Sequence, residues 1–123
     1  MNKICTTLEQ GQKLVELGVD VNTADMQWVN TGYCMRVLPV DDYEAQSSSS
    51  VTHAWSLSAL ISVLPRFIEF KGDKYYLRFM KEYVEYANDE VSITGRYLHT
   101  TGNDNLVDAC YEMIVKLKEK DLI

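Results

Sequence analysis

The sequence predicts an α+β fold in which an antiparallel sheet of about four to six strands is covered on one face by about three helices. Three observations carry this prediction. Large apolar and polar side chains alternate on either side of the turn signal Lys71-Gly72-Asp73-Lys74, as in a hairpin with one buried face. Apolar residues recur at helical spacing over residues 104–120. Residues 54–79 join a short apolar helix to the hairpin, and the other elements are expected to pack around them.

The chain length of 123 residues predicts a single domain, 1–123. A domain of this size buries about two-thirds of the surface that its unfolded chain exposes, so it needs no disulfide or metal to fold. No apolar run reaches the ~18 residues of a membrane span, and the first residues lack the apolar core of a signal peptide. Cys5, Cys34 and Cys110 are odd in number and far apart, which favours reduced thiols and a cytoplasmic location.

The formal net charge is −6, and the acidic residues are scattered along the chain. Broad contact with nucleic acid requires clustered lysine and arginine, so this acidic balance disfavours it while leaving room for a local basic patch. Scattered acidic residues are typical of a soluble surface.

The N-terminal third begins with a helix over residues 7–17. Thr7 and Gln10 have the spacing of a capping box, and Gly18 is placed to end the helix. Gly11 either weakens this helix or lets another backbone approach it. Residues 19–25 form a connector, with room for a single helical turn after Asn22 or Thr23.

Two strands are expected next, Met26–Asn30 and Tyr33–Leu38, around Thr31-Gly32. A helix over Met26–Asn30 is the competing interpretation. The burial candidates here are Trp28, Tyr33, Cys34, Val37 and Leu38. Residues 39–53 are rich in serine and acidic side chains and are expected to form a flexible loop.

The second helix is expected over residues 55–64. Leu57, Leu60, Ile61 and Leu64 share one helical face. Thr52 or Ser56 can cap its first turn, and the proline that follows Leu64 ends it.

The hairpin is expected to pair Phe70 with Tyr75 and Ile68 with Leu77 across a two-residue loop. This register gives a buried face composed of Ile68, Phe70, Tyr75, Leu77 and Phe79. The opposite face is composed of Phe67, Glu69, Lys71, Lys74, Tyr76, Arg78 and Met80.

Two further strands, Tyr83–Ala87 and Val91–His99, are expected around a turn at residues 88–90. The final helix, residues 104–120, carries an apolar stripe and is expected to cover the sheet. The stripe comprises Leu106, Cys110, Met113 and Leu117, with Val107 and Ile114 beside it. Glu112 and Lys116 are spaced for an ion pair.

The sequence offers no motif for chemistry. His53 and His99 have no second metal ligand nearby, and the cysteine spacings do not fit zinc. Ser56 follows His53 and Asp42 only in sequence, without the surroundings of a nucleophile motif. The glycines are isolated, and Asp41-Asp42 is an ordinary surface pair. No catalytic residue, cofactor or metal is therefore predicted. An enzyme with its site between the 39–53 loop and the sheet is the alternative.

The aromatic residues give the one functional hypothesis. Tyrosines and arginines gather in the strand region, and an exposed aromatic face with arginines can dock a protein or stack bases. The candidate interaction surface comprises Tyr76, Arg78, Tyr83, Tyr86, Arg96 and Tyr97. The sequence thus favours a small interaction module for a protein partner or a second copy, with single-stranded nucleic acid as a weaker alternative. The competing interpretation is that helices simply cover this face.

Several segments also resemble a set of small uncharacterised proteins from prophage and mobile-element regions of Bacteroides-type gut bacteria. The similar segments are residues 23–26, Ala54 to Leu60, Leu64-Pro65, Tyr76 to Phe79 and Val107 to Ile114. The resemblance implies a cytoplasmic bacterial protein of phage origin. It carries over no catalytic or binding residue.

Overall fold

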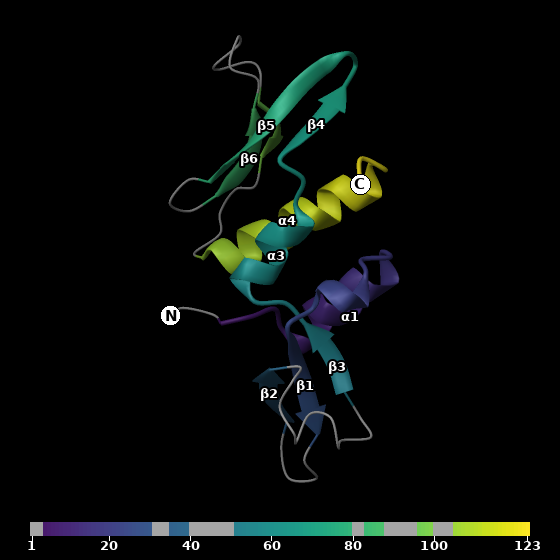
Figure 1. Cartoon of the computed structure of the whole chain (residues 1–123), viewed down its shortest axis with the longest axis vertical. Coiled ribbons are helices and arrows are strands. Elements are labelled where there is room, and N and C mark those ends of the chain that lie inside the picture. Colours follow the sequence, from purple (N-terminus) through teal and green to yellow (C-terminus); the bar gives the residue numbers. More distant parts are fainter. Residues whose placement is uncertain (1–3, 31–34, 40–50, 80–82, 88–95, 100–104) are drawn as a thin grey trace.

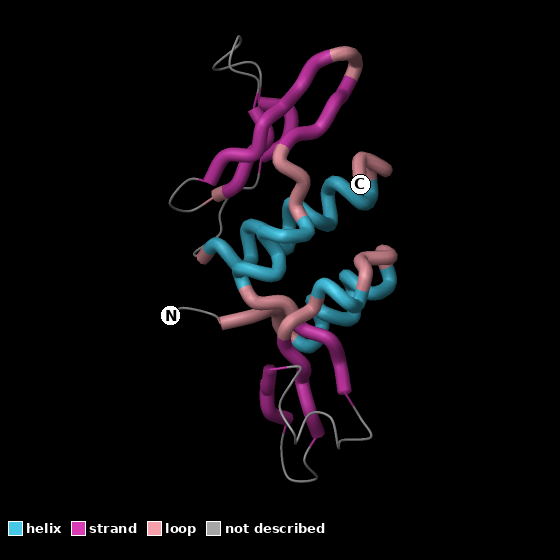
Figure 2. Tube along the Cα trace, viewed as in Figure 1, coloured by secondary structure: helices cyan, strands magenta, loops and turns pink. Residues whose placement is uncertain are grey.

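The computed structural model describes residues 4–30, 35–39, 51–79, 83–87, 96–99 and 105–123. In these residues an antiparallel sheet lies at each end of the molecule, with the helices between the two sheets (Figures 1 and 2). One sheet has the order β2-β1-β3, with β1 at Met26–Asn30, β2 at Met35–Pro39 and β3 at Val51–Ala54. The other has the order β4-β5-β6-β7, with β4 at Phe67–Phe70, β5 at Asp73–Phe79, β6 at Val84–Ala87 and β7 at Arg96–His99. The helices are α1 (Leu8–Glu16), the 3₁₀ turn η1 (Val21–Thr23), α3 (Leu57–Val63) and α4 (Leu106–Glu119).

The α+β class and the antiparallel pairing are confirmed, but the strands form two sheets and not one. The physical reason is the position of α3. The chain leaves β3 through the fully buried Trp55 and enters α3, which packs against α4 before the chain continues to β4. Trp55 is held there because its Nε1 donates to Thr23 Oγ1 at 2.9 Å and its backbone N–H donates to Thr6 Oγ1 at 3.1 Å.

The helix α1 begins with the predicted capping box. Thr7 Oγ1 accepts from the Gln10 N–H at 3.1 Å, and the Thr7 N–H donates to Gln10 Oε1 at 2.9 Å. Gly11 is explained by a close approach, because a Cβ there would lie 2.2 Å from the carbonyl oxygen of His53 in β3. The glycine therefore lets α1 pack directly on the first sheet.

In the first sheet, β1 and β2 confirm the predicted strands, and the helix interpretation of residues 26–30 is wrong. The predicted loop over residues 39–53 is wrong at both ends, because Pro39 ends β2 and residues 51–54 form β3. Pairing with β1 supplies the backbone hydrogen bonds that composition alone does not reveal. Residues 40–50 and the burial candidates Tyr33 and Cys34 lie outside the described residues, as does the side chain of Leu38.

The helix α3 is capped by Ser56, whose Oγ accepts from the Ala59 N–H at 3.2 Å. Leu60 and Leu64 are buried as predicted. Ile61 is 38% exposed, and Ala59 is buried instead. The small alanine side chain thus belongs to the face that packs inward, which a stripe drawn through the larger residues does not show.

The β4–β5 hairpin turns at Lys71 and Gly72, whose φ angles of 52° and 84° are both positive. This is the backbone of a type I′ turn, with glycine second. The pairing is Ile68 with Tyr75 and Phe67 with Tyr76, so the predicted register is wrong by two residues. A shift of two residues keeps each side chain on its predicted face. Met80 lies outside the described residues.

The core lies between α3, α4 and the inner face of the second sheet. The predicted stripe of α4 is confirmed at its buried members, which are Val107, Cys110, Met113, Ile114 and Leu117. Leu106 is half-buried in the first helical turn, and the Lys116–Glu112 pair is confirmed at 3.3 Å. Ile68 belongs to this core, and Leu77 packs against it. Phe79, predicted on the buried face, is 40% exposed at the last position of β5.

The last two strands match the prediction in part. β6 falls within the strand expected at residues 83–87, and β7 falls within the strand expected at residues 91–99. The turn expected at residues 88–90, and residues 91–95, lie outside the described residues.

Candidate interaction surface

The second sheet divides the predicted surface residues between its two faces. Tyr76 and Arg78 are exposed on the face that points away from the helices, and Tyr83 is half-buried just before β6. Arg96 and Tyr97 are in β7, where the structure describes the backbone alone. The structure therefore brings Tyr76 and Arg78 onto one exposed face.

Tyr86 does not belong to this surface, because its side chain is fully buried. It pairs with Leu77 across the sheet, and its hydroxyl donates to the Pro65 carbonyl oxygen at 2.6 Å. Burial, and secondarily the nearby Cys110 thiol, raises the pKa of the hydroxyl well above its usual value. The sequence missed this placement because both faces of β6 carry buried side chains, so alternation does not reveal which one faces the helices.

Phe67 is the residue that the predicted surface omitted. It faces Tyr76 across the β4–β5 pair, with ring centroids 5.9 Å apart and planes tilted by 46°. Phe67 is 39% exposed and Tyr76 is 44% exposed. The alternation of β4 had placed Phe67 on the same face as Tyr76, and that was the available signal.

Basic side chains accompany these rings. Lys74 Nζ lies 4.9 Å from the Phe67 ring centroid, a cation–π contact that holds the charge beside the aromatic pair. Arg78 Nη1 lies 3.9 Å from Oε1 of Glu85, which is buried on the neighbouring strand, while the Arg78 side chain is 44% exposed. We call Phe67, Glu69, Lys74, Tyr76 and Arg78 the outer hairpin surface.

The hairpin is locally basic in an acidic chain. Residues 66–79 contain four basic and two acidic side chains, a formal charge of +2, whereas the whole chain carries −6. The basic residues are Arg66, Lys71, Lys74 and Arg78, and the acidic ones are Glu69 and Asp73. Over residues 66–99 basic and acidic side chains balance at six each, so the positive charge is confined to the hairpin. An anionic group is therefore attracted to the hairpin itself.

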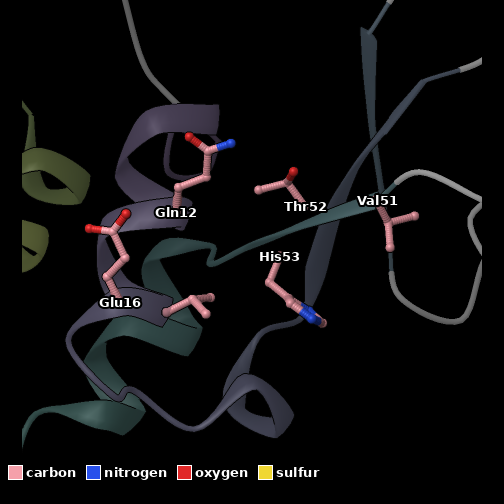
Figure 3. A pocket seen from close by; sticks show the side chains of 6 residues that line it. Gln12, Glu16, Val51, Thr52 and His53 are labelled. Atoms are coloured by element: carbon pink, nitrogen blue, oxygen red, sulfur yellow. The ribbon is translucent and has the colours of Figure 1, made fainter.

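A groove between α1 and β3 is the second candidate site (Figure 3). It measures about 530 Å³, is open to solvent, and is lined by Gln12, Val15, Glu16, Val51, Thr52 and His53. The Nδ1 atom of His53 is buried and has no hydrogen-bond partner in the described part of the chain. The His53 imidazole and the Glu16 carboxylate point in different directions in Figure 3, so they do not form an acid–base pair. Val51, Thr52 and His53 belong to the 39–53 segment of the predicted enzyme alternative, and the rest of that segment from residue 40 to 50 lies outside the described residues.

The other candidates for chemistry have structural roles. Ser56 Oγ donates to the Asp25 carboxylate and accepts from the Ala59 N–H, so its hydroxyl holds the first turn of α3 in place. Cys110 is fully buried on α4, and burial raises the pKa of its thiol to about 12. It therefore stays a protonated, unreactive thiol near neutral pH. No group of three metal-ligating side chains occurs among the residues described.

Comparisons with known proteins give no family for this chain. No family model, no curated protein and no solved structure matches it. Within the described ranges, no helix combines the length and the apolar character that a membrane crossing requires. The functional argument therefore depends on the geometry of the outer hairpin surface.

Proposed function

We propose that this protein is an interaction module that binds a partner protein through the outer hairpin surface. The observation that carries the proposal is the exposed Phe67–Tyr76 pair beside Lys74 and Arg78. Tyrosine, other aromatic residues and arginine are the side chains that most often dominate binding energy in protein interfaces.

The rest of the fold sharpens this argument. Trp55 and Tyr86 are fully buried, so the chain does bury large aromatic side chains in its core. Each exposed apolar Å² that a partner covers contributes roughly 25 cal/mol, which the folded monomer leaves unused at Phe67 and Tyr76. Partner binding accounts for aromatic residues at two exposed positions where the monomer gains only about 1–2 kcal/mol from them.

Single-stranded nucleic acid is the second candidate, because exposed aromatic rings with adjacent cations also stack bases. The local charge of +2 supports it, and the chain's charge of −6 opposes it. The α1–β3 groove supports an enzyme less well than the outer hairpin surface supports an interaction module. The side chains of His53 and Glu16 in this groove point in different directions (Figure 3).

A displayed library of random peptides tests the proposal before any partner has been identified. Peptides are selected on the wild-type protein and then measured on two double variants whose removed side chains have similar exposed fractions. The first variant is Phe67→Ser with Tyr76→Ser. The control is Val21→Ser with Ile61→Ser, which removes side chains that are 37% and 38% exposed on η1 and α3.

We expect most selected peptides to lose at least tenfold in affinity on the Phe67/Tyr76 variant and to keep their affinity on the control. Selected peptides that bind both variants as they bind wild type would contradict the proposal. Retention of an oligothymidylate at physiological salt, lost with the same two rings, would favour the nucleic-acid alternative.

A further inference from the structure

The strand β4 forms one edge of its sheet, and half of its backbone groups point away from β5. The Leu77 N–H donates to the Arg66 carbonyl at 3.0 Å, which makes these two residues a hydrogen-bonded pair. Such pairs alternate along an antiparallel ladder, so Ile68 also turns its backbone groups toward β5. The N–H and C=O groups of Phe67 and Glu69 therefore point outward, and no strand lies beyond them in the described residues.

The charge around this edge indicates what it can accept. Arg66, Lys71 and Lys74 lie on or next to β4, and the hairpin carries +2. A second copy of the chain would place +2 against +2, whereas an acidic segment would be attracted. Glu69 is the one acidic side chain of the outer hairpin surface, and it should weaken that attraction.

The area indicates the size of the occupant. A buried aromatic side chain removes about 150–250 Å² from water, so two rings that are about two-fifths exposed offer on the order of 150 Å². A stable interface between globular proteins needs about 800 Å² from each partner. The rings alone therefore suit a short segment, with backbone hydrogen bonds supplying the rest.

We infer that β4 receives a short acidic segment of the partner protein as an added strand. The outward N–H and C=O groups of Phe67 and Glu69 bind the backbone of the segment. Its side chains on one face contact the Phe67 ring, and its carboxylates lie within the field of Arg66, Lys71 and Lys74. This inference is based on the proposed function, because it specifies the partner of the same surface.

The test uses a fluorescent peptide that alternates glutamate with valine and tyrosine, measured by anisotropy at low and physiological salt. Glu69→Pro removes an outward N–H and leaves the β4–β5 ladder intact, since proline is tolerated where the N–H of an edge strand faces solvent. The matched control is Glu69→Gln, which removes the same charge and keeps the N–H.

We expect Glu69→Gln to bind about two- to fivefold more tightly than wild type, and Glu69→Pro about tenfold more weakly than Glu69→Gln. A lysine version of the peptide should not bind. If Glu69→Pro does not fold, as shown by circular dichroism, the peptide carries the change instead. Two versions of the peptide are then made, one methylated at every odd backbone nitrogen and one at every even backbone nitrogen. One version should lose its binding to the wild-type protein, and the other should keep it.

Equal binding of the peptide to Glu69→Pro and Glu69→Gln would overturn strand addition. Equal binding of the two N-methylated peptides to the wild-type protein would overturn it as well. Binding of the lysine peptide in place of the glutamate peptide, or of neither, would overturn the acidic partner. Dimerisation of the protein without peptide, abolished by Glu69→Pro, would assign the edge to a second copy. In each case the proposed function stands or fails separately, by the response of library-selected peptides to the loss of Phe67 and Tyr76.

Discussion

The two faces of the second sheet are both aromatic, and they differ in what lies against them. On the inner face, Tyr86 is fully buried and hydrogen-bonds the Pro65 carbonyl. On the outer face, Tyr76 is 44% exposed and contacts Phe67. The same residue type thus stabilises the fold at one position and is available to a partner at another. Counting tyrosines in the sequence does not separate these roles, whereas strand register does.

The largest expected effect is on the covered side. Met113→Asp places a carboxylate in the core between α3, α4 and the second sheet, where Met113 is fully buried. We expect the free energy of unfolding to fall by about 3–5 kcal/mol, measured by urea denaturation. Ile61→Asp, at a position that is 38% exposed on α3, is the control and should cost about 1 kcal/mol or less. Equal losses would mean that α4 does not form the core.

A smaller effect on stability is expected when the hydroxyl of the buried Tyr86 or of the exposed Tyr76 is removed. Tyr86→Phe removes the donor to the Pro65 carbonyl and should lower the unfolding free energy by about 1–2 kcal/mol. Tyr76→Phe removes a hydroxyl from an exposed ring and should change it by less than about 0.5 kcal/mol. Thermal melts of the two variants measure the difference. A larger loss for Tyr76→Phe would reverse the assignment of the faces.

The smallest effect is a dependence on pH that belongs to the covered side alone. Burial raises the pKa of the Cys110 thiol from its ordinary value of 9.0 to about 12. The unfolded thiol therefore releases its proton first as the pH rises, so stability falls between about pH 9 and pH 12. Cys110→Ala should lose less stability than wild type between pH 8.5 and 10, read from urea midpoints, in a range below the ordinary tyrosine pKa of about 10. An identical decline in both proteins would show that Cys110 is not the titrating group.

The sequence predicted the elements whose signals are local. The capping box of Thr7 and Gln10, the stripe of α4 and the glycine turn of the hairpin each depend on neighbours in the chain. The division into two sheets was missed because it depends on where α3 packs, which is a contact between distant residues. The hairpin register was missed because Lys71 adopts a positive φ, which lysine rarely does.

The candidate surface was predicted in part, because some of its members follow from local alternation and others depend on how the strands pair. Alternation along β5 put Tyr76 and Arg78 on an outward face, as the structure shows. Tyr86 was misplaced because β6 carries buried side chains on both of its faces, so alternation along that strand does not show which side chains face the helices. Phe67 was grouped with the correct face, yet its contact with Tyr76 depends on the two-residue shift of register.

One unfolding experiment tests the central claim, that the outer rings are present for a partner and the inner ring for the fold. The free energy of unfolding is measured for Phe67→Ser with Tyr76→Ser and, separately, for Tyr86→Ser. We expect the outer double variant to lose about 1–2 kcal/mol and the single inner variant to lose about 3–5 kcal/mol. An outer double variant that loses as much stability as Tyr86→Ser would show that Phe67 and Tyr76 stabilise the fold, and it would contradict the account.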